Sequence, residues 1–285
     1  MESETPVLEV LASGAGISIQ DSGRSGWKRF GIAPGGAMDL ESARRANLLV
    51  GNDAGAPVLE LLFTGAKFLV LTSSELAIAG AEVECDWPTW RNFRVEAGGE
   101  ISFGPLRAGV WSYLAIRGGF AAPRWFGSAS ANPRAGFGET VQPGTRLACE
   151  NRLPPEEISS RFVPELVREE YGRTPVLPVW RGPEWDGFND EARGKFLEQT
   201  WRISAQSDRA GYRLEGIALE SRLRMPSAPV AVGAIQVPPS GHPIVLLRDG
   251  PTVGGYPRLA ILESSSISRF TQCAPGTDVR FALTE

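Results

Sequence analysis

Two short stretches bring a carboxylate, an amide and an arginine together in glycine-containing turns. They read RSGWKRFGI from residue 24 and RAGYRLEGI from residue 209, and similar residues precede them, ISIQDSG and ISAQSD. An arginine fork suits carboxylate or phosphate oxygens. The candidate catalytic groups are therefore Asp21 with Arg24 and Asp208 with Arg209. The structural alternative, an Asp–Arg pair that only stabilises each turn, agrees with the sequence equally well.

Other polar side chains lie in the same turns or in two further Gly-rich segments. GIAPGGAMD (31–39) leads into a helix that Asp39 can cap, so its N–H groups could bind an anion. GAIQVPPSGHPIVLLRDGPTVGGYPRLA (233–260) has turns where a ligand can approach the main chain closely. Plain structural loops are the alternative, and for Asp249 the alternative is a surface pair with Arg248. The predicted binding residues are Gln20, Gly36, Met38, Asp39, Ser207, Tyr212, Gln236, Asp249, Thr252, Gly254, Gly255 and Tyr256.

Absent motifs narrow the chemistry. The chain has no P-loop, no G-x-G-x-x-G that opens a helix and no G-x-S-x-G nucleophile elbow. Its one histidine, His242, excludes a three-histidine metal centre and is interpreted as a loop residue. The three cysteines, Cys85, Cys149 and Cys273, lie far apart and are interpreted as buried free thiols in a reducing compartment. We predict no metal site, and acid–base work falls to carboxylates.

Composition describes an ordinary globular chain. It has 285 residues with 42% hydrophobic and 22% charged residues, enough for a sizeable core without disulfide or metal support. The net charge of −4 gives no reason to expect nucleic acid or an anionic membrane as a partner. The N-terminus MESETPVLEV lacks an apolar signal region, and no run of 18 apolar residues exists, so we expect a cytoplasmic protein.

Short β-rich segments bounded by turn residues dominate both halves of the chain, and RLAILESSSI (258–267) is read as one of them. Helices are predicted at DLESARRANLLVGN (39–52), NDEARGKFLEQT (189–200) and VPELVREEYG (163–172), with Asp39 and Asn189 as N-caps of the first two.

A Pro-rich, charged segment separates the two strand-rich halves. We therefore predict a mainly β protein with a β-barrel lobe at 1–150, a connector at 151–183 and a second lobe at 184–285, since closed barrels protect strand edges. The repeated phrase favours an old duplication over chance.

Three long motifs carry a family resemblance. They are QDSGRSGWKRFGIAPGGAMDLESARRANLLVGND, SAQSDRAGYRLEG and GAIQVPPSGHPIVLLRDGPTVGGYPRLA, and WSYLAIRGG (111–119) adds a fourth. The chain resembles the biotin-dependent carboxyltransferase-like family from about residue 8 to residue 283. That family includes the C component of bacterial 5-oxoprolinase, allophanate hydrolase subunit 2, the antagonist of a histidine-kinase inhibitor and the carboxyltransferase region of urea carboxylase. The segment 127–147 departs from the family's usual GSRSTD…GGxxGRxL pattern, which could mean an altered pocket or a divergent substrate.

The resemblance implies two cyclophilin-like β-barrel lobes, a B-type partner protein of related fold and an A-type partner protein. It implies a hydrolase component that opens 5-oxoproline, a lactam, to glutamate with ATP as the substrate of the complex, at a site that no motif locates. The alternatives are carboxyl transfer from carboxybiotin to urea or a similar amide, and a regulator that only binds its partner. No covalent biotin is expected, because the chain lacks an Ala-Met-Lys-Met site.

Within this resemblance, Arg24 and Arg209 would hold anionic groups. The two aspartates would orient these arginines or relay protons, and Gln236, Asp249 and Tyr256 would help to form the pocket. Preorganised charges and N–H groups of this kind stabilise an anion that develops during a reaction.

Overall fold

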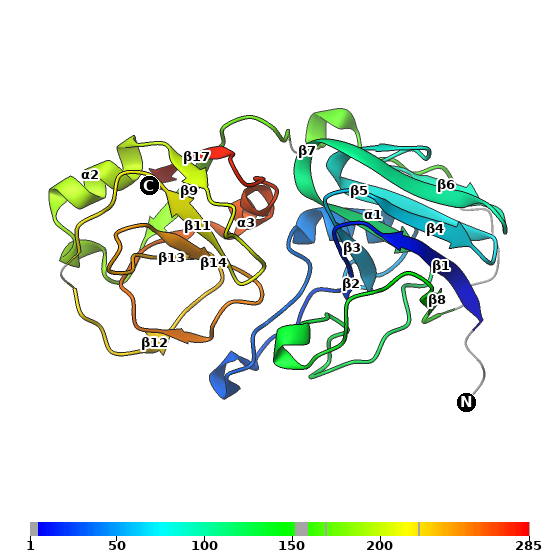
Figure 1. Cartoon of the computed structure of the whole chain (residues 1–285), viewed down its shortest axis with the longest axis horizontal. Helices are drawn as coiled ribbons and strands as arrows, with labels where there is room; N and C mark the ends of the chain where they lie inside the picture. The colour runs from blue at the N-terminus through cyan, green and yellow to red at the C-terminus, as the bar shows by residue number, and fades with distance from the viewer. Residues whose placement is uncertain (1–4, 152–158, 169, 222, 285) are drawn as a thin grey trace. The chain divides into compact units, whose positions relative to one another are not determined.

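The computed structural model describes residues 5–151, 159–168, 170–221 and 223–284. The chain divides into two compact units, the first comprising residues 1–24 and 35–171, the second residues 25–34 and 172–285 (Figure 1). The predicted connector, 151–183, therefore contributes to both units, and its residues 152–158 lie outside the described part. The first repeated phrase also divides, because Arg24 belongs to the first unit and the residues after it to the second.

The first unit is built on an eight-stranded sheet that forms a half-barrel. Its main path runs β2-β3-β7-β4-β1-β8, and β5 pairs with both β6 and β7. Except for a few bulges the pairs are regular and antiparallel. The strands are β1 (Pro6–Ser13), β2 (Ile17–Gln20), β3 (Val58–Leu62), β4 (Ala66–Val70), β5 (Ser74–Cys85), β6 (Asn92–Val95), β7 (Glu100–Ile116) and β8 (Arg146–Ala148).

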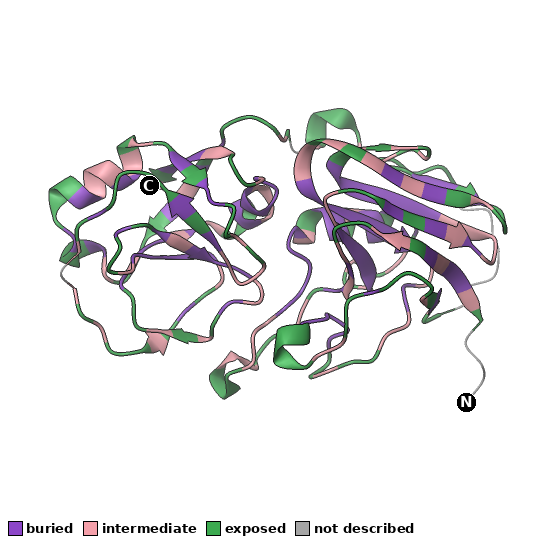
Figure 2. Ribbon diagram, in the orientation of Figure 1, coloured by how far each residue is buried: buried purple, intermediate pink, exposed green. Residues whose placement is uncertain are grey.

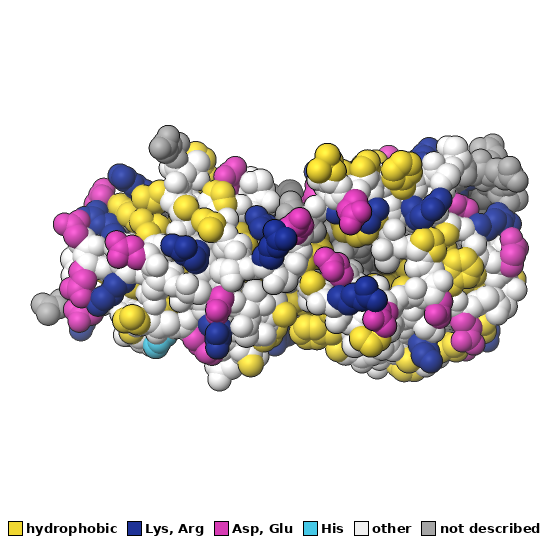
Figure 3. Space-filling model, turned by 90° about the horizontal axis from the view of Figure 1, so that it is seen from above, with side chains coloured by type: hydrophobic (Ala, Val, Ile, Leu, Met, Phe, Trp, Pro, Cys, Tyr) yellow, Lys and Arg dark blue, Asp and Glu magenta, His cyan; other side chains and the backbone are white. Residues whose placement is uncertain are grey.

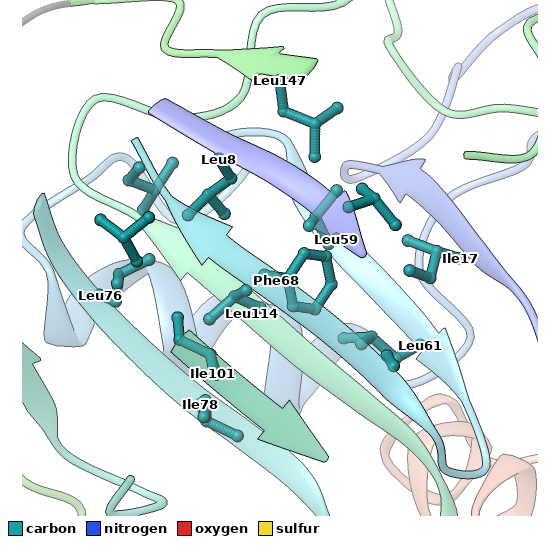
Figure 4. Packing of buried hydrophobic residues seen from close by; sticks show 14 of the residues in the cluster. Leu8, Ile17, Leu59, Leu61, Phe68, Leu76, Ile78, Ile101, Leu114 and Leu147 are labelled. Carbon is teal, nitrogen blue, oxygen red and sulfur yellow. The ribbon is translucent and has the colours of Figure 1, made fainter. Parts of the chain in front are cut away.

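Alternation along these strands directs one set of side chains into a core (Figure 2). In β4 the apolar residues Ala66, Phe68 and Val70 are buried, whereas Lys67 is exposed. Phe68 lies among the leucine and isoleucine side chains of the neighbouring strands and meets Phe103 edge to face at 6.1 Å (Figure 4). Burying one such side chain contributes about 1.5–3 kcal/mol, so burial of the alternating apolar residues stabilises the sheet.

The helix α1 (Leu40–Leu49) packs against β5 and β7. It begins where predicted: the Asp39 carboxylate accepts from the Ser42 N–H at 3.0 Å and so caps the helix. Gly51 follows the helix with φ of 75°, a conformation that glycine adopts without strain.

The second unit is a closed barrel of seven strands in the order β10-β11-β14-β13-β16-β9-β17 (Figure 1). Closure leaves no sheet edge, and β17 completes the barrel by running parallel to β9. The strands are β9 (Val176–Arg181), β10 (Trp201–Ile203), β11 (Gly211–Glu215), β13 (Ala234–Gln236), β14 (Ile244–Leu246), β16 (Arg258–Leu262) and β17 (Asp278–Leu283), with a separate ribbon of β12 (Ala228–Pro229) and β15 (Val253–Gly254).

Two helices belong to this barrel unit, α2 (Asp190–Glu198) and α3 (Ser264–Thr271). The prediction of α2 is confirmed, with the Asn189 side chain accepting from the Ala192 N–H at 2.8 Å. The helix α3 was missed, because its serines have weak helix propensity and it follows β16 almost directly. Burial of Ile267 and Phe270, three positions apart, stabilises it instead.

The helix predicted at 163–172 is wrong. In the described part of that segment only a short 3₁₀ turn forms, Glu165–Val167. Leu166 is 96% exposed, so a helix here would bury no apolar face. The other 3₁₀ turns are Lys28–Phe30, Pro133–Ala135 and Trp185–Gly187. The mainly β fold class is confirmed.

Candidate functional site

Asp21 follows β2 and is almost completely buried, with 6% of its surface exposed. One carboxylate oxygen accepts from the hydroxyls of Ser128 and Ser130 at 2.6 and 2.5 Å and from the Gly23 N–H at 2.7 Å. The other accepts from the Ala129 N–H at 2.7 Å. A carboxylate so fully engaged holds the segment 128–130 against the end of β2.

Arg24 is also buried, with 1% exposed. Its Nε donates to the Trp125 carbonyl at 3.3 Å, its Nη2 donates to the Ser130 carbonyl, and its guanidinium lies 4.8 Å from the centre of the Phe137 ring. From the sequence, the structural alternative was an Asp21–Arg24 pair that stabilises the turn, and these contacts differ from it. Both side chains instead hold the segment 125–137.

Gln20 completes this group. It is fully buried, and its amide donates to the Ser18 hydroxyl and to the Ala131 carbonyl, both at 3.0 Å. The structure therefore brings three predicted residues, Gln20, Asp21 and Arg24, onto one backbone segment. The serines at the other end of these bonds were not predicted, because they are more than 100 residues distant in sequence.

The predicted anion loop before α1 is fixed by a second buried group. The N–H of Met38 donates to the Glu60 carboxyl at 2.7 Å, and the N–H of Asp39 donates to the Tyr113 hydroxyl at 2.7 Å. Tyr113 in turn donates to Glu60 at 2.9 Å. Gly36, with φ of 95°, packs so tightly that an added Cβ would lie 3.1 Å from Gly23 N.

Glu60 and Tyr113 were missed by the sequence analysis. The signal for Glu60 is a single carboxylate inside the apolar run VLELL of β3, where a charged residue is expensive unless it has partners. Burial and the neighbouring carboxylates of Glu60 and Asp39 raise the pKa of Tyr113 well above its usual value, so the phenol keeps its proton. The pair therefore positions the loop before α1.

In the second repeated phrase the residues are more open. Asp208 is exposed, and its carboxylate accepts from the Ala210 N–H at 2.8 Å and the Gly211 N–H at 3.3 Å within its own turn. Ser207 accepts from the Arg213 N–H at 3.1 Å. Tyr212 points inward, 4% exposed, and donates to the Thr271 carbonyl at 2.8 Å.

Arg209 pairs with Asp249. Its Nε and Nη2 reach the two carboxylate oxygens of Asp249 at 2.7 and 3.3 Å, a two-pronged contact. The two side chains retain 19% and 11% exposure. This pair joins two of the predicted segments, and the expected alternative of an Asp249 pair with Arg248 does not describe it.

A fourth group forms around Gln236 in β13. Its amide donates to the Tyr256 carbonyl at 3.1 Å, and an added Cβ on Gly254 would lie 2.7 Å from that amide. A larger residue at position 254 would therefore displace the Gln236 amide. Thr252 accepts from the Val230 N–H through its carbonyl, and Gly255 and Tyr256 lie exposed beside them.

The predicted residues thus form two groups in the first unit and two in the second. The local structures of the repeated phrase also differ, because residues after Arg24 enter a 3₁₀ turn whereas those after Arg209 enter β11. Lys28 in the first phrase donates to the Val230 carbonyl at 2.5 Å, and burial lowers its pKa.

Two cavities lie within the first unit. The larger, about 840 Å³, is lined by both acidic and basic side chains, among them Glu82, Glu84, Arg107 and Arg168. The smaller, about 520 Å³, is mostly apolar and lies beside the group formed by Gln20, Asp21 and Arg24, with Trp125, Ala129 and Ala131 in its lining.

Basic and acidic side chains are interspersed on the face shown in Figure 3. Within the described residues no group of three or more His, Cys, Asp or Glu side chains could hold a metal ion. The helices in the same part of the chain include none that is both long and apolar enough to span a membrane. His242 is exposed between β13 and β14, as a loop residue.

Comparison with known proteins gives the family. The model of the carboxyltransferase domain, subdomain A and B, matches residues 30–283. The chain is 34% identical to the C component of 5-oxoprolinase from Escherichia coli (strain K12), covering 96% of this chain and 90% of that one. It is 29% identical to urea amidolyase of Saccharomyces cerevisiae, covering 98% of this chain but 17% of that protein.

Among solved structures, the crystal structure of TTHA0988 superposes with a TM-score of 0.90 at 32% identity. The match covers 99% of this chain and 56% of that one, so this chain spans about half the length of that protein. The family model covers most of the chain, and relatives and solved structures agree with it over nearly the whole length. The chain therefore belongs to the carboxyltransferase domain family, subdomains A and B.

Proposed function

We propose that this chain is the C component of an ATP-dependent 5-oxoprolinase, a hydrolase complex that opens 5-oxoproline to glutamate. The observation that carries the proposal is the match to the C component of 5-oxoprolinase, at 34% identity over 96% of this chain and 90% of the relative. Shared length on both sides means that the likeness extends to the whole of that relative. The complex would work in the cytoplasm.

The chain would contribute a surface that binds an anion, and Arg209 with Asp249 is the best candidate. A substrate-binding group must reach solvent, and these side chains are 19% and 11% exposed, whereas Arg24 and Asp21 are 1% and 6% exposed. A guanidinium carries five N–H donors in a planar fork, a geometry that suits the oxygens of an anionic ligand. Asp208 is exposed on the same turn as Arg209 and extends the proposed surface.

Partner proteins of the B and A types would supply the remaining groups, including the ATP site. ATP would be a substrate of the complex that phosphorylates the lactam oxygen and so activates the carbonyl carbon for attack by water. The C–N bond of the ring would then break to give glutamate, with release of ADP and phosphate, and no covalent biotin on this chain is required. The residues of this chain would orient the substrate and stabilise its anionic groups. Asp21, Arg24, Gln236 and Gly254 would act by positioning these loops, because the polar side chains among them bind within the chain.

The experiment is a coupled assay of the purified chain with its partner proteins, measuring glutamate and ADP released from 5-oxoproline and ATP. We expect release only when all components are present and a loss of at least about tenfold with Arg209→Ala, about 1.4 kcal/mol of binding. Arg202→Ala is the matched control, because Arg202 makes the same two-pronged contact with Asp278 in the same unit, at 2.9 and 3.4 Å, on an exposed surface. Equal activities of the two variants would contradict the assigned site.

Carboxyl transfer is the second candidate. The 29% identity to urea amidolyase over 98% of this chain favours it. A fully assembled complex that releases no glutamate, but carboxylates urea when given a carboxybiotin donor, would select this function. A complex with neither activity would leave binding of the partner as the role.

A further inference from the structure

The smaller cavity of the first unit is a built pocket that the proposed reaction does not use. We name it the 122–147 pocket, after the segment that supplies all of its lining except Ile19. Its volume of about 520 Å³ falls within the range of about 300–1,000 Å³ in which proteins hold small molecules. The segment is also where the sequence departs from the pattern that the family resemblance implies.

The lining of this pocket selects against anions. Its apolar residues include Ile19, Trp125, Ala129, Ala131, Val141 and Leu147, and none of its lining residues is Lys, Arg or His. Two arginines lie next to lining residues in sequence, but each binds a carboxylate, Arg124 that of Glu150 at 2.7 Å and Arg146 that of Glu9 at 3.0 Å.

At the rim, the exposed Glu139 carboxylate would repel an anion. Thr140 and Thr145 offer hydroxyls that can orient an uncharged polar group.

The lining of the pocket favours a flat ligand. Trp125 provides an aromatic ring, and many of the other lining residues are small, among them Ala129, Ala131, Gly136 and Gly138. Gly138 approaches so closely that an added Cβ would lie 3.3 Å from both the Trp125 ring and Ala131. Aromatic rings stack in offset contacts that add about 0.5–1.5 kcal/mol to the burial of their area.

The wall is held in place from behind by the buried side chains after β2. Arg24 binds the carbonyls of Trp125 and Ser130, Asp21 binds the Ala129 N–H, and Gln20 binds the Ala131 carbonyl. A wall fixed in this way does not need to be ordered when a ligand arrives, which lowers the cost of binding.

From this geometry we propose that the 122–147 pocket binds a small uncharged molecule with a planar apolar ring. Gln20, Asp21 and Arg24 are its positioning residues. Because 5-oxoproline carries a carboxylate, this ligand is a different molecule from the proposed substrate. The proposed ligand site can therefore be tested independently of the proposed function.

The test uses the whole chain and saturation-transfer NMR with three probes: indole, benzamide and benzoate. Benzamide and benzoate have nearly the same shape and differ in charge. We expect indole and benzamide to bind, and benzoate to bind at least about tenfold more weakly, which corresponds to about 1.4 kcal/mol. Equal binding of benzamide and benzoate would overturn the uncharged-ligand assignment.

Filling the pocket locates the binding. Ala131→Leu adds a side chain in the wall, and Ala122→Leu does so at a half-buried position that tolerates the change if the first variant fails to fold. Each should weaken benzamide binding at least about tenfold, whereas Ala97→Leu, on an exposed turn of the same unit, should not. Unchanged binding in a folded filled variant, or no binding by the native chain, would overturn the proposal. Protection of the 122–147 segment only by a partner protein would assign the pocket to a side chain of that protein instead.

Discussion

Replacement of Asp21 and of Asp208 by alanine should have very different effects, although both aspartates stand before the same repeated phrase. Asp21 is 6% exposed and accepts four hydrogen bonds, from two backbone N–H groups and two serine hydroxyls, at 2.5 to 2.7 Å. Asp208 is exposed and accepts two from its own turn, at 2.8 and 3.3 Å.

The magnitude follows from burial. A hydrogen bond to a charged acceptor contributes about 1.5–3 kcal/mol, and a buried donor left without its acceptor costs about 1–3 kcal/mol. The two serine hydroxyls can rotate toward other acceptors, so the two N–H groups of Gly23 and Ala129 carry most of the cost. We expect Asp21→Ala to destabilise the first unit by about 3–5 kcal/mol, and Asp208→Ala the second unit by less than about 1 kcal/mol, because water replaces its carboxylate.

Hydrogen exchange measured by mass spectrometry is the suitable assay, because it reports on each unit separately. A local loss of about 3–5 kcal/mol raises exchange by roughly 100- to 4,000-fold, at about 1.4 kcal/mol for each factor of ten. The rise should be confined mainly to peptides from residues 125–141 in Asp21→Ala. Equal and small effects of the two substitutions would refute the view that Asp21 organises this segment.

Three further predictions concern single groups. The hydrogen bonds from Arg258 hold the pKa of Glu184 below its ordinary value of 4.5, so the stabilisation from this pair should be complete above about pH 5 and be lost as pH falls through the lowered pKa. Urea unfolding at several pH values should show this loss of stability in the native chain but not in Glu184→Gln. Parallel curves of stability against pH for the two proteins would contradict the prediction. Tyr113→Phe removes the acceptor of the Asp39 N–H and the donor to Glu60, and it should lower the free energy of unfolding in urea by about 2 kcal/mol. Tyr256→Phe, at a 45% exposed residue, should lower it by less than about 0.5 kcal/mol. Equal losses in the two variants would contradict the prediction. Burial raises the pKa of Cys273 to about 12, so iodoacetamide at pH 8 should modify the half-buried Cys149 first and Cys273 only after unfolding. Mass spectrometry of the peptides would show the order of modification. Early labelling of Cys273 would argue against its burial.

Much of the fold could be predicted from local signals. The helices α1 and α2 begin at Asp39 and Asn189 because a side-chain oxygen at the N-cap binds an N–H three residues ahead, an interaction within one turn. The mainly β fold followed from short alternating segments between turn residues. The helix α3 and the segment 163–172 could not be predicted in this way, because burial against the rest of the chain decided both.

The residue types in the candidate site were predictable, but their partners were not. The repeated phrase named Asp21, Arg24, Asp208 and Arg209, and sequence symmetry made the two pairs look equivalent. The first pair binds a segment more than 100 residues away, and Arg209 binds Asp249, 40 residues away. The spacing of residues within the repeated phrase does not predict which distant residues these side chains bind.

The sequence by itself therefore determined the fold class and two of the three α-helices in the described part of the chain, and it offered candidate residues for the chemistry. Only the tertiary structure decided which polar side chains face solvent and which hold the fold together. The physical reason is that the cost of burying a charge depends on the partners that surround it, and those partners come from distant parts of the chain. Asp21 and Arg24 of the first phrase consequently form a buried frame, whereas Arg209 of the second phrase forms a partly exposed ion pair with Asp249.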